Sequence, residues 1–399
     1  MKKSAYRYHQ SKLKIKNIFI VIICICLLCV TIYFHLTRIK LMIKGYGFDA
    51  QNIILSLDDE QIDEYLLYDG KIDFDMWDQV KNQKHYYDYQ YYSQLYKEKS
   101  HQDIVKEIDQ FYQLYERKLS TLKYDIPLCR ELMKTYSIHD ISNLASYPYT
   151  YQQVKDYLKI NGCIIEDIPK YIQSKKEPLE AVLSVSYPFI DSHNKVNHQY
   201  IINEPEQYLI LIKKGFQISS KYVPSDLIKV NIPIAPDNTH DMLRKDAANA
   251  LKQMYDDALK LNYHLVLNSG YRSYNEQKKL YDYYFTIYDE VTASGLVAIP
   301  GTSEHQLGLG VDLTSQSVID KQRMVFGDTE EYKWVVQNAH LYGFILRYPK
   351  DRSAITGTAN EPWHLRYVGK TVAKEIYDHQ WTLEDYILHH GFDYHISRK

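Results

Sequence analysis

An uncharged apolar run near the N-terminus constrains the arrangement of this chain most strongly. Residues 18–34 carry no charged side chain, and with their flanks they reach the roughly 20 residues that an α-helix needs to cross a bilayer. The preceding segment is basic and lacks acidic residues; it contains Lys2, Lys3, Arg7, Lys12, Lys14 and Lys16. The positive-inside rule therefore predicts a cytoplasmic tail over residues 1–16 and a transmembrane anchor over residues 17–37.

A cleaved signal peptide is the alternative interpretation of this run. No small-x-small cleavage motif follows it, so the uncleaved anchor is favoured. We therefore expect a single-pass cell-membrane protein whose catalytic domain is extracellular.

The balance of charge limits the classes of partner. The chain has 48 Lys and Arg against 50 Asp and Glu, a formal net charge of −2. A protein that binds nucleic acid along its surface is usually strongly basic. The sequence therefore predicts no nucleic-acid partner.

Residues 38–175 have the pattern of a helical extracellular region. Apolar residues recur at spacings of three and four, as in Ile104, Ile108, Phe111 and Tyr115, which is typical of amphipathic helices. The region contains Cys129 and Cys163, which would pair in an oxidising compartment or lie separately as buried thiols.

From about residue 180 the pattern changes. Two apolar runs, residues 181–186 and 208–212, predict strands within a connecting segment over residues 176–224. Prolines then mark the entry to a final domain over residues 225–395. In that domain we expect a helix over residues 241–261 and a strand over residues 264–267, in an α+β fold.

A glycine-rich stretch in this final domain carries the first candidate site residues. His305 and Asp312 are seven residues apart, so an uninterrupted strand would point them to opposite faces. Gly308 and Gly310 lie between them and allow a bend or bulge. Such a bend would bring both side chains to one centre.

A second stretch adds Glu361 and His364, which are adjacent if Pro362 begins a helical turn. Two imidazoles and one carboxylate match the three protein ligands of a catalytic zinc site, and Glu361 would then act on the water as a general base. Taken singly, a histidine in a glycine-rich strand is more often a satisfied core residue. The prediction of a zinc site therefore depends on these residues occurring together.

A third segment, Ser269-Gly270-Tyr271-Arg272-Ser273-Tyr274-Asn275-Glu276-Gln277, directly follows a predicted strand, where binding groups concentrate. With Ser303-x-His305-x-x-Gly308-x-x-x-Asp312 and Glu361-x-Trp363-His364 it resembles the VanY-type zinc D-alanyl-D-alanine carboxypeptidases. The stretch from Gly343 to Pro349 also matches. The resemblance covers roughly residues 225–395 and leaves the helical region outside.

The resemblance implies a role for each matching residue. His305, Asp312 and His364 would bind Zn²⁺, and Glu361 would activate the water. Arg272 would stabilise the oxyanion or grip the terminal carboxylate of the substrate. Ser303 and Gln277 would hydrogen-bond the peptide end. Gly310 stands where many relatives have alanine, and this difference removes no catalytic group.

The predicted protein is thus a membrane-anchored, zinc-dependent D,D-carboxypeptidase that removes the terminal D-alanine from peptidoglycan stem peptides. Its zinc-peptidase domain would have a central, mainly antiparallel sheet, preceded by the helical domain and the transmembrane helix. An L,D-carboxypeptidase and an endopeptidase use the same zinc chemistry, and the sequence does not distinguish these two alternatives from the D,D-carboxypeptidase. From a different class, a non-catalytic cell-wall-binding module is the further alternative.

Overall fold

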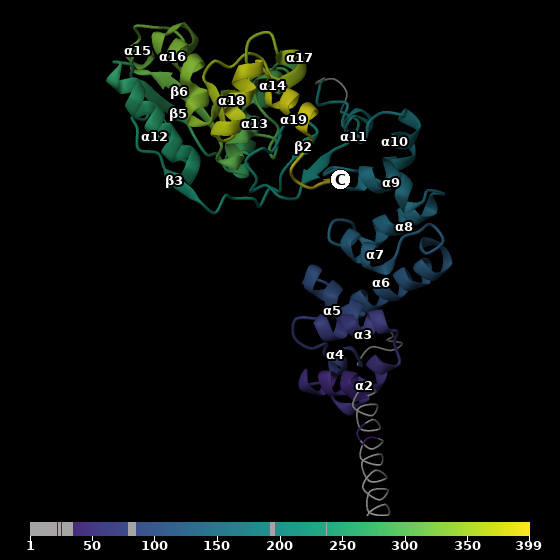
Figure 1. The fold of residues 1–399 in the computed structure, drawn as a ribbon. Helices are drawn as coiled ribbons and strands as arrows, with labels where there is room; N and C mark the ends of the chain where they lie inside the picture. Colours follow the sequence, from purple (N-terminus) through teal and green to yellow (C-terminus); the bar gives the residue numbers. More distant parts are fainter. Residues whose placement is uncertain (1–21, 23–24, 26–34, 79–84, 192–195, 237) are drawn as a thin grey trace, which may run out of the picture. The chain divides into compact units, whose positions relative to one another are not determined.

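The structure is a computed structural model that describes residues 22, 25, 35–78, 85–191, 196–236 and 238–399 (Figure 1). The chain divides into two compact units. The first comprises Met1–Thr121 and Asp125–Ser142, and the second comprises Leu122–Tyr124 and Asn143–Lys399. The boundary expected at residue 175 lies within the second unit.

The expected membrane anchor over residues 17–37 falls mostly outside the described residues. Across the described residues, no helix has the length and apolar character of a membrane span. This finding contradicts the predicted single-pass cell-membrane localisation. It gives no support to the predicted transmembrane helix or to the membrane as a partner.

The first unit is helical, as predicted. The longest helix among its described residues, α6 (His101–Leu114), buries Ile104, Ile108 and Phe111 at the expected spacing. The Ser100 side chain caps the start of this helix by accepting from the Asp103 N–H. The other elements are α2 (Phe48–Leu55), α3 (Asp59–Leu67), α4 (Phe74–Asp78), α5 (Tyr86–Leu95), the π-helix η1 (Tyr115–Leu119), α7 (Ile126–Leu132) and α8 (Ile138–Ser146), which begins in this unit.

A mostly buried arginine connects two acidic residues of the first unit. The Arg130 guanidinium donates to both Asp88 carboxylate oxygens and to Glu64, and its Cζ atom lies 4.6 Å from the centroid of the Tyr87 ring. The Tyr112 hydroxyl donates to the same Asp88 carboxylate. We call Arg130, Asp88, Glu64 and Tyr112 the Arg130 cluster.

Helices also open the second unit: α9 (Tyr151–Leu158), η2 (Ile165–Asp167), α10 (Ile168–Ser174) and α11 (Pro178–Ser186). The strand predicted over residues 181–186 is therefore wrong. Pro178 occupies the first helical position, where proline is favoured, and Ala181, Val182 and Leu183 are all buried. A short apolar run does not distinguish a buried helix from a strand.

A three-stranded sheet follows in the order β2-β1-β9. Its strands are β1 (Tyr200–Ile202), β2 (Phe216–Gln217) and β9 (Ile396–Arg398). The strand predicted over residues 208–212 is wrong, because that buried segment is irregular. The backbone of this segment forms hydrogen bonds with side chains instead of with a neighbouring strand. The Leu211 N–H donates to the Tyr394 hydroxyl at 2.9 Å, and the Tyr208 and Ile210 carbonyls accept from Arg366.

The candidate site lies on a four-stranded sheet in the order β5-β6-β8-β7, in which all neighbours are antiparallel. The strands are β5 (Leu265–Ser269), β6 (Gly310–Ser315), β8 (His364–Tyr367) and β7 (Phe344–Leu346). Asp312 pairs with Ser269 on one side and with His364 on the other. The predictions of mixed helix and sheet and of an antiparallel sheet are confirmed for this part.

Helix α12 (Lys245–Lys260) contacts β5 (Figure 1). It begins later than the predicted residue 241 because β4 (Met242–Arg244) pairs with β3 (Leu227–Lys229). The remaining elements are α13 (Tyr274–Ile287), α14 (Glu290–Leu296), η3 (Glu304–Leu307), α15 (Gln316–Ile319), η4 (Phe326–Asp328), α16 (Glu330–Asn338), η5 (Ala339–Tyr342), α17 (Ser353–Thr356), α18 (Lys370–His379) and α19 (Leu383–His390).

The two cysteines considered for a disulfide belong to different units, Cys129 to the first and Cys163 to the second. Both are buried thiols rather than halves of a disulfide. Of the two interpretations, separate thiols is the one observed.

Candidate metal centre

The bend between His305 and Asp312 is a short helical turn followed by a strand. His305 lies in the 3₁₀ turn η3, which ends at Gly308 with a φ of +66°, a conformation that glycine adopts without strain. Asp312 then lies within β6. The predicted glycine bend is thus present at Gly308, and it takes the place of the bulge that was the other possibility.

Gly310 has a different part in the same segment, since it allows a close approach. A Cβ atom at this position would lie 3.0 Å from the Glu304 Cβ and 3.2 Å from the His364 Cε1. The missing side chain therefore leaves room for the His364 ring against η3.

His364 and Glu361 are joined by a tight turn. The His364 N–H donates to the Glu361 carbonyl at 3.1 Å, so the two residues are neighbours as expected, although the segment is a turn and not a helix. His364 is the first residue of β8, directly opposite Asp312. Register in the sheet therefore brings the second histidine to the carboxylate.

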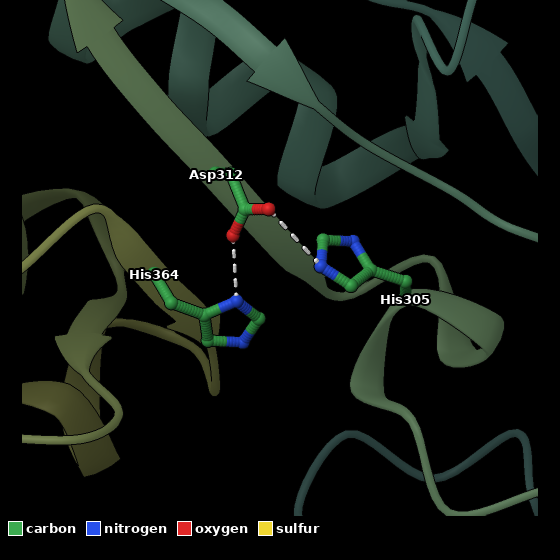
Figure 2. Close-up of side chains that lie close together, drawn as sticks. All are labelled: His305, Asp312 and His364. Atoms are coloured by element: carbon green, nitrogen blue, oxygen red, sulfur yellow. Dashed lines mark hydrogen bonds and ion pairs between the residues drawn. The ribbon is translucent and has the colours of Figure 1, made fainter. Parts of the chain in front are cut away.

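Three predicted ligands converge (Figure 2). His305, Asp312 and His364 each offer one donor atom, and these atoms all lie within 4.8 Å of one another. The Asp312 Oδ2 lies 3.4 Å from the His305 Nε2, and its Oδ1 lies 2.8 Å from the His364 Nδ1. Two imidazole nitrogens and one carboxylate oxygen form a donor set suited to Zn²⁺ with an open position.

The two histidines present opposite ring nitrogens to this centre. The His305 Nδ1 lies 2.7 Å from the Gly270 carbonyl oxygen, which only accepts hydrogen bonds, so the hydrogen is on Nδ1 and the Nε2 lone pair is available. The His364 Nε2 instead faces Glu304 Oε2 at 3.2 Å, which leaves Nδ1 toward Asp312. Partners of this kind behind histidine ligands orient the rings in metal sites.

In the metal-free cluster, the surroundings favour a negative charge on Asp312 and a positive charge on His364. Burial raises the pKa of Asp312, but the adjacent His305 and His364 outweigh it and hold that pKa well below its usual range. Burial lowers the pKa of His364, yet its hydrogen bonds to Asp312 and Glu304 raise that pKa to about 10. Burial lowers the pKa of His305. A cation beside Asp312 is therefore favoured.

Glu361 differs from the other acids of the site because its pKa is raised. Burial is the main cause, and it outweighs the opposing effect of the nearby His364. A carboxylate with a raised pKa is a better proton acceptor near neutral pH.

Arg272 is held firmly on the loop after β5. Its guanidinium donates to the Gln277 Oε1 at 2.9 Å and to the Ser269 Oγ at 3.1 Å, and its N–H donates to the His305 carbonyl at 3.2 Å. Burial lowers the Arg272 pKa, with Asp312 acting in the opposite direction. Arginine stays charged even so.

The remaining predicted residues are Gln277 and Ser303. Both ends of the buried Gln277 amide are used, one by Arg272 and the other by the Ala298 carbonyl at 2.8 Å. The geometry places Gln277 behind Arg272 as a support. Ser303 directly precedes η3 and is buried, and its hydroxyl makes no hydrogen bond to any residue that the structure describes.

The sequence interpretation missed Glu304, Arg347 and Arg366, which are buried together behind His364. A signal was available, because Arg347 and Arg366 are charged residues within apolar strand sequences. Charged residues are almost never fully buried unless they are paired. Their partners could not be read from spacing alone.

Comparisons with known proteins identify relatives of the part of the chain that contains this site. The family described as VanY, D-alanyl-D-alanine carboxypeptidase, matches residues 240–370. YodJ of Bacillus subtilis (strain 168) is 41% identical over 220 residues, which are 54% of this chain and 81% of that relative. A D-alanyl-D-alanine carboxypeptidase of Enterococcus faecalis (strain ATCC 700802 / V583) is 37% identical over 199 residues, 46% of this chain and 67% of the relative.

Two solved structures are also similar. The LdcB LD-carboxypeptidase is 43% identical, with a TM-score of 0.45 over 49% of this chain and 92% of that chain. A mutant of the vancomycin-resistance D,D-pentapeptidase VanY in complex with Zn(II) is 32% identical, with a TM-score of 0.37 over 45% and 98% of the two chains. Given the family match and the extent of the identity, this chain belongs to the VanY family of D-alanyl-D-alanine carboxypeptidases and is a zinc metallopeptidase with peptidoglycan carboxypeptidase activity.

Proposed function

We propose that this protein is a D,D-carboxypeptidase that removes the terminal D-alanine from peptidoglycan stem peptides, with its catalytic domain over residues 225–395. The observation that carries the proposal is the convergence of His305, Asp312 and His364 on one centre, with Glu361 in the adjoining turn. The description of the matching family and the name of the E. faecalis relative support the D-alanyl-D-alanine specificity.

Three residues would hold the zinc ion: His305 through Nε2, His364 through Nδ1, and Asp312 through its carboxylate. When bound, zinc lowers the pKa of a water molecule and polarises the scissile carbonyl. This donor set lacks thiolates, which is typical of catalytic rather than structural zinc sites.

Glu361 is proposed as the general base and acid. Its carboxylate takes a proton from the attacking water and returns it to the leaving amine nitrogen of D-alanine. The raised pKa of Glu361 suits both transfers, because the group accepts a proton readily and can also release it.

Arg272 is proposed to face either the oxygen that becomes negative in the transition state or the terminal carboxylate of the substrate. Gln277 and Ser269 fix its planar fork, and a fixed cation stabilises developing charge without reorganisation. The Ser303 hydroxyl is proposed to hydrogen-bond the peptide end, and Gln277 to position Arg272 from behind.

The test is to incubate the full chain, loaded with zinc, with defined pentapeptide and tetrapeptide stems and to identify the products by mass spectrometry. We expect D-alanine and a tetrapeptide from the pentapeptide. Release of alanine from the tetrapeptide alone would overturn the D,D assignment in favour of an L,D-carboxypeptidase. Internal fragments would indicate an endopeptidase instead.

The control for contaminating peptidases is Glu361→Gln, which removes the proposed base and should retain zinc while losing product release. Unchanged turnover in this variant would refute the role of Glu361. If the wild-type chain binds no zinc and releases no product but sediments with purified cell walls, it is a non-catalytic wall-binding module.

A further inference from the structure

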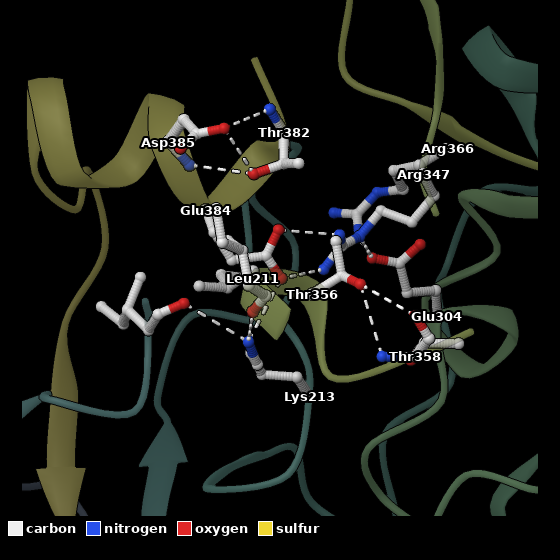
Figure 3. Close-up of polar contacts among 12 residues, drawn as sticks. Leu211, Lys213, Glu304, Arg347, Thr356, Thr358, Arg366, Thr382, Glu384 and Asp385 are labelled. Carbon is white, nitrogen blue, oxygen red and sulfur yellow. Dashed lines mark hydrogen bonds and ion pairs between the residues drawn. The ribbon is translucent and has the colours of Figure 1, made fainter. Parts of the chain in front are cut away.

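A buried group of five charged side chains (Figure 3) contacts His364 through Glu304. They are Lys213, Glu304, Arg347, Arg366 and Glu384, and each side chain is at most 6% exposed. We call them the Glu304 network. Such complete burial is costly for charges unless each is paired and hydrogen-bonded, so the contacts of each member matter.

Glu304 connects this network to the candidate metal centre. Its Oε1 accepts from the Arg347 Nε at 2.7 Å and from an Arg366 terminal nitrogen at 2.8 Å. Its Oε2 is directed the other way and lies 3.2 Å from the His364 Nε2. One oxygen therefore fixes the carboxylate while the other meets the imidazole.

The two arginines are themselves fixed. Arg347 donates through its two terminal nitrogens to both oxygens of Glu384, at 2.9 and 2.8 Å. Arg366 donates to the carbonyls of Tyr208 and Ile210, at 3.0 and 2.8 Å. A carboxylate between two anchored guanidinium groups has little freedom to rotate, and its ionised form is favoured by both cations.

The His364 ring has little freedom as well. The Tyr348 ring stacks on it with a centroid distance of 5.2 Å, and the position of a Cβ on Gly310 would be only 3.2 Å from its Cε1. The ring is therefore confined on one face and on one edge, and its two nitrogens keep separate surroundings.

We propose that Glu304 is a positioning residue that determines which ring nitrogen of His364 carries the hydrogen. An ionised carboxylate only accepts hydrogen bonds, so Glu304 keeps a hydrogen on Nε2. Nδ1, which lies 2.8 Å from the Asp312 Oδ1, is then the nitrogen that can give up its hydrogen and bind a metal. The inference rests on the proposed role of His364 as a metal ligand. It adds to that role a residue that touches neither metal nor substrate.

Glutamine at position 304 would reverse this requirement. The side-chain oxygen of glutamine would turn toward Arg347 and Arg366, because only an acceptor suits two guanidinium groups. The amide NH₂ would then face the His364 Nε2 and donate to it, which moves the ring hydrogen to Nδ1. A nitrogen that carries hydrogen cannot bind zinc, so the substitution opposes metal binding while leaving every ligand residue in place.

The test measures zinc affinity of the full-length apo-protein by competition with a chromophoric chelator. Glu304→Gln is expected to weaken zinc binding about 10–100-fold, as for other partners that orient ligands. Glu384→Gln is the matched control: it removes a carboxylate from the same network two contacts further from His364. We expect it to lower the melting temperature and to change zinc affinity by no more than a few-fold.

Histidine ¹⁵N NMR of the zinc-loaded wild-type protein supplies a readout that does not depend on any variant folding. We expect the His364 Nε2 to carry a slowly exchanging hydrogen and Nδ1 to be the bound nitrogen. Zinc on Nε2 would overturn the inference, as would a Glu304→Gln protein with wild-type affinity or one no weaker than Glu384→Gln.

His364→Ala separates a failure of this inference from a failure of the site itself. If this variant keeps wild-type zinc affinity, His364 is no ligand and the proposed metal centre fails. If it loses zinc while Glu304→Gln does not, only the positioning role of Glu304 is wrong.

Discussion

Each of the two units buries arginine between carboxylates, but the two groups end differently. In the Arg130 cluster, the Asp88 carboxylate accepts hydrogen bonds from Arg130 and from the Tyr112 hydroxyl. Glu64 accepts a hydrogen bond from another nitrogen of the same guanidinium. In the Glu304 network, one branch continues to the imidazole of His364. Both groups follow the same rule that buried charges are paired.

The difference lies in what the last side chain can still do. Tyr112 ends the Arg130 cluster with a hydroxyl whose pKa is raised far above its usual range, mainly by burial. The hydroxyl therefore keeps its proton, which it already donates to Asp88 in a hydrogen bond. His364 has a second nitrogen on the far side of its ring, toward Asp312. An ion network whose last side chain has no further binding atom, such as the Arg130 cluster, contributes to stability alone. A network that ends on a group with a second binding atom, such as His364, can also orient that atom toward a site.

The largest effect is expected from Asp312→Ala, which tests the metal centre at which the Glu304 network ends. The substitution removes one of the three ligands and also the partner of both histidines. Zinc affinity should fall by more than the roughly 100-fold upper range for an orienting partner, measured by chelator competition. Asp320→Ala, an exposed aspartate on the same segment, is the control, and equal affinities for the two variants would refute the ligand assignment.

Arg130→Met tests how much the Arg130 cluster contributes to stability. The substitution leaves the buried Asp88 without its cation, and an uncompensated buried charge costs about 3–5 kcal/mol of unfolding free energy. Chemical unfolding followed by circular dichroism measures the loss. Lys134→Met, at an exposed pair with Glu131, should leave the unfolding free energy almost unchanged, because surface ion pairs contribute little.

The zinc affinity of the folded Arg130→Met protein should equal that of the wild type. A loss of affinity comparable to that of Glu304→Gln would show that the Arg130 cluster does not contribute to stability alone, and the contrast between the two groups would disappear.

Arg272→Lys examines a cation that is fixed without a buried carboxylate partner. Lysine keeps the charge but loses the fork that Gln277 and Ser269 hold, so kcat/KM should fall about 10²–10³-fold, as when a preorganised donor is lost. Zinc content should not change. The exposed Arg323→Lys serves as control, and full activity in Arg272→Lys would show that charge alone suffices.

Asp167 provides the smallest effect and an intermediate case, because it is buried but its partner Lys170 is exposed. Burial raises its pKa, yet hydrogen bonds from Lys170, Ser186 and Arg398 outweigh this and lower it. A lowered folded-state pKa contributes stability above the unfolded value of about 3.9 and loses it as the pH falls through the folded value.

Asp167→Asn should therefore cost about 1–3 kcal/mol at pH 7, and the difference from wild type should shrink as unfolding is repeated below about pH 4. Asp156→Asn, at an exposed pair with Lys159, should show little difference at either pH. A pH-independent difference at Asp167 would mean that its charge is not the source of the stability.

The sequence allowed the local features to be predicted because their physical causes are local. The three-and-four spacing in α6, the bend at Gly308 and the closeness of Glu361 to His364 all depend on residues within one or two turns. The convergence of three segments on one centre was inferred from their resemblance to a family, and register in the sheet accounts for it.

The features that could not be predicted depend on distant residues. Residues 181–186 are apolar enough for a strand, and burial against the rest of the second unit decides for the helix α11. Residues 208–212 lack a ladder because Arg366 and Tyr394 satisfy their backbone. The support of Arg272 by Gln277, and of His364 by Glu304, required positions in space that spacing does not give.

The place of Glu384 in the chain also bears on how the protein matures. The proposed ligands end at His364, whereas Glu384, which holds Arg347, lies on α19, and β9 follows still later and pairs with β1. During synthesis from the N-terminus, all three ligands therefore leave the ribosome before the residues that hold their supporting arginine in place. A chain that ends before Glu384 would therefore keep all three proposed ligands but lack the carboxylate that holds Arg347.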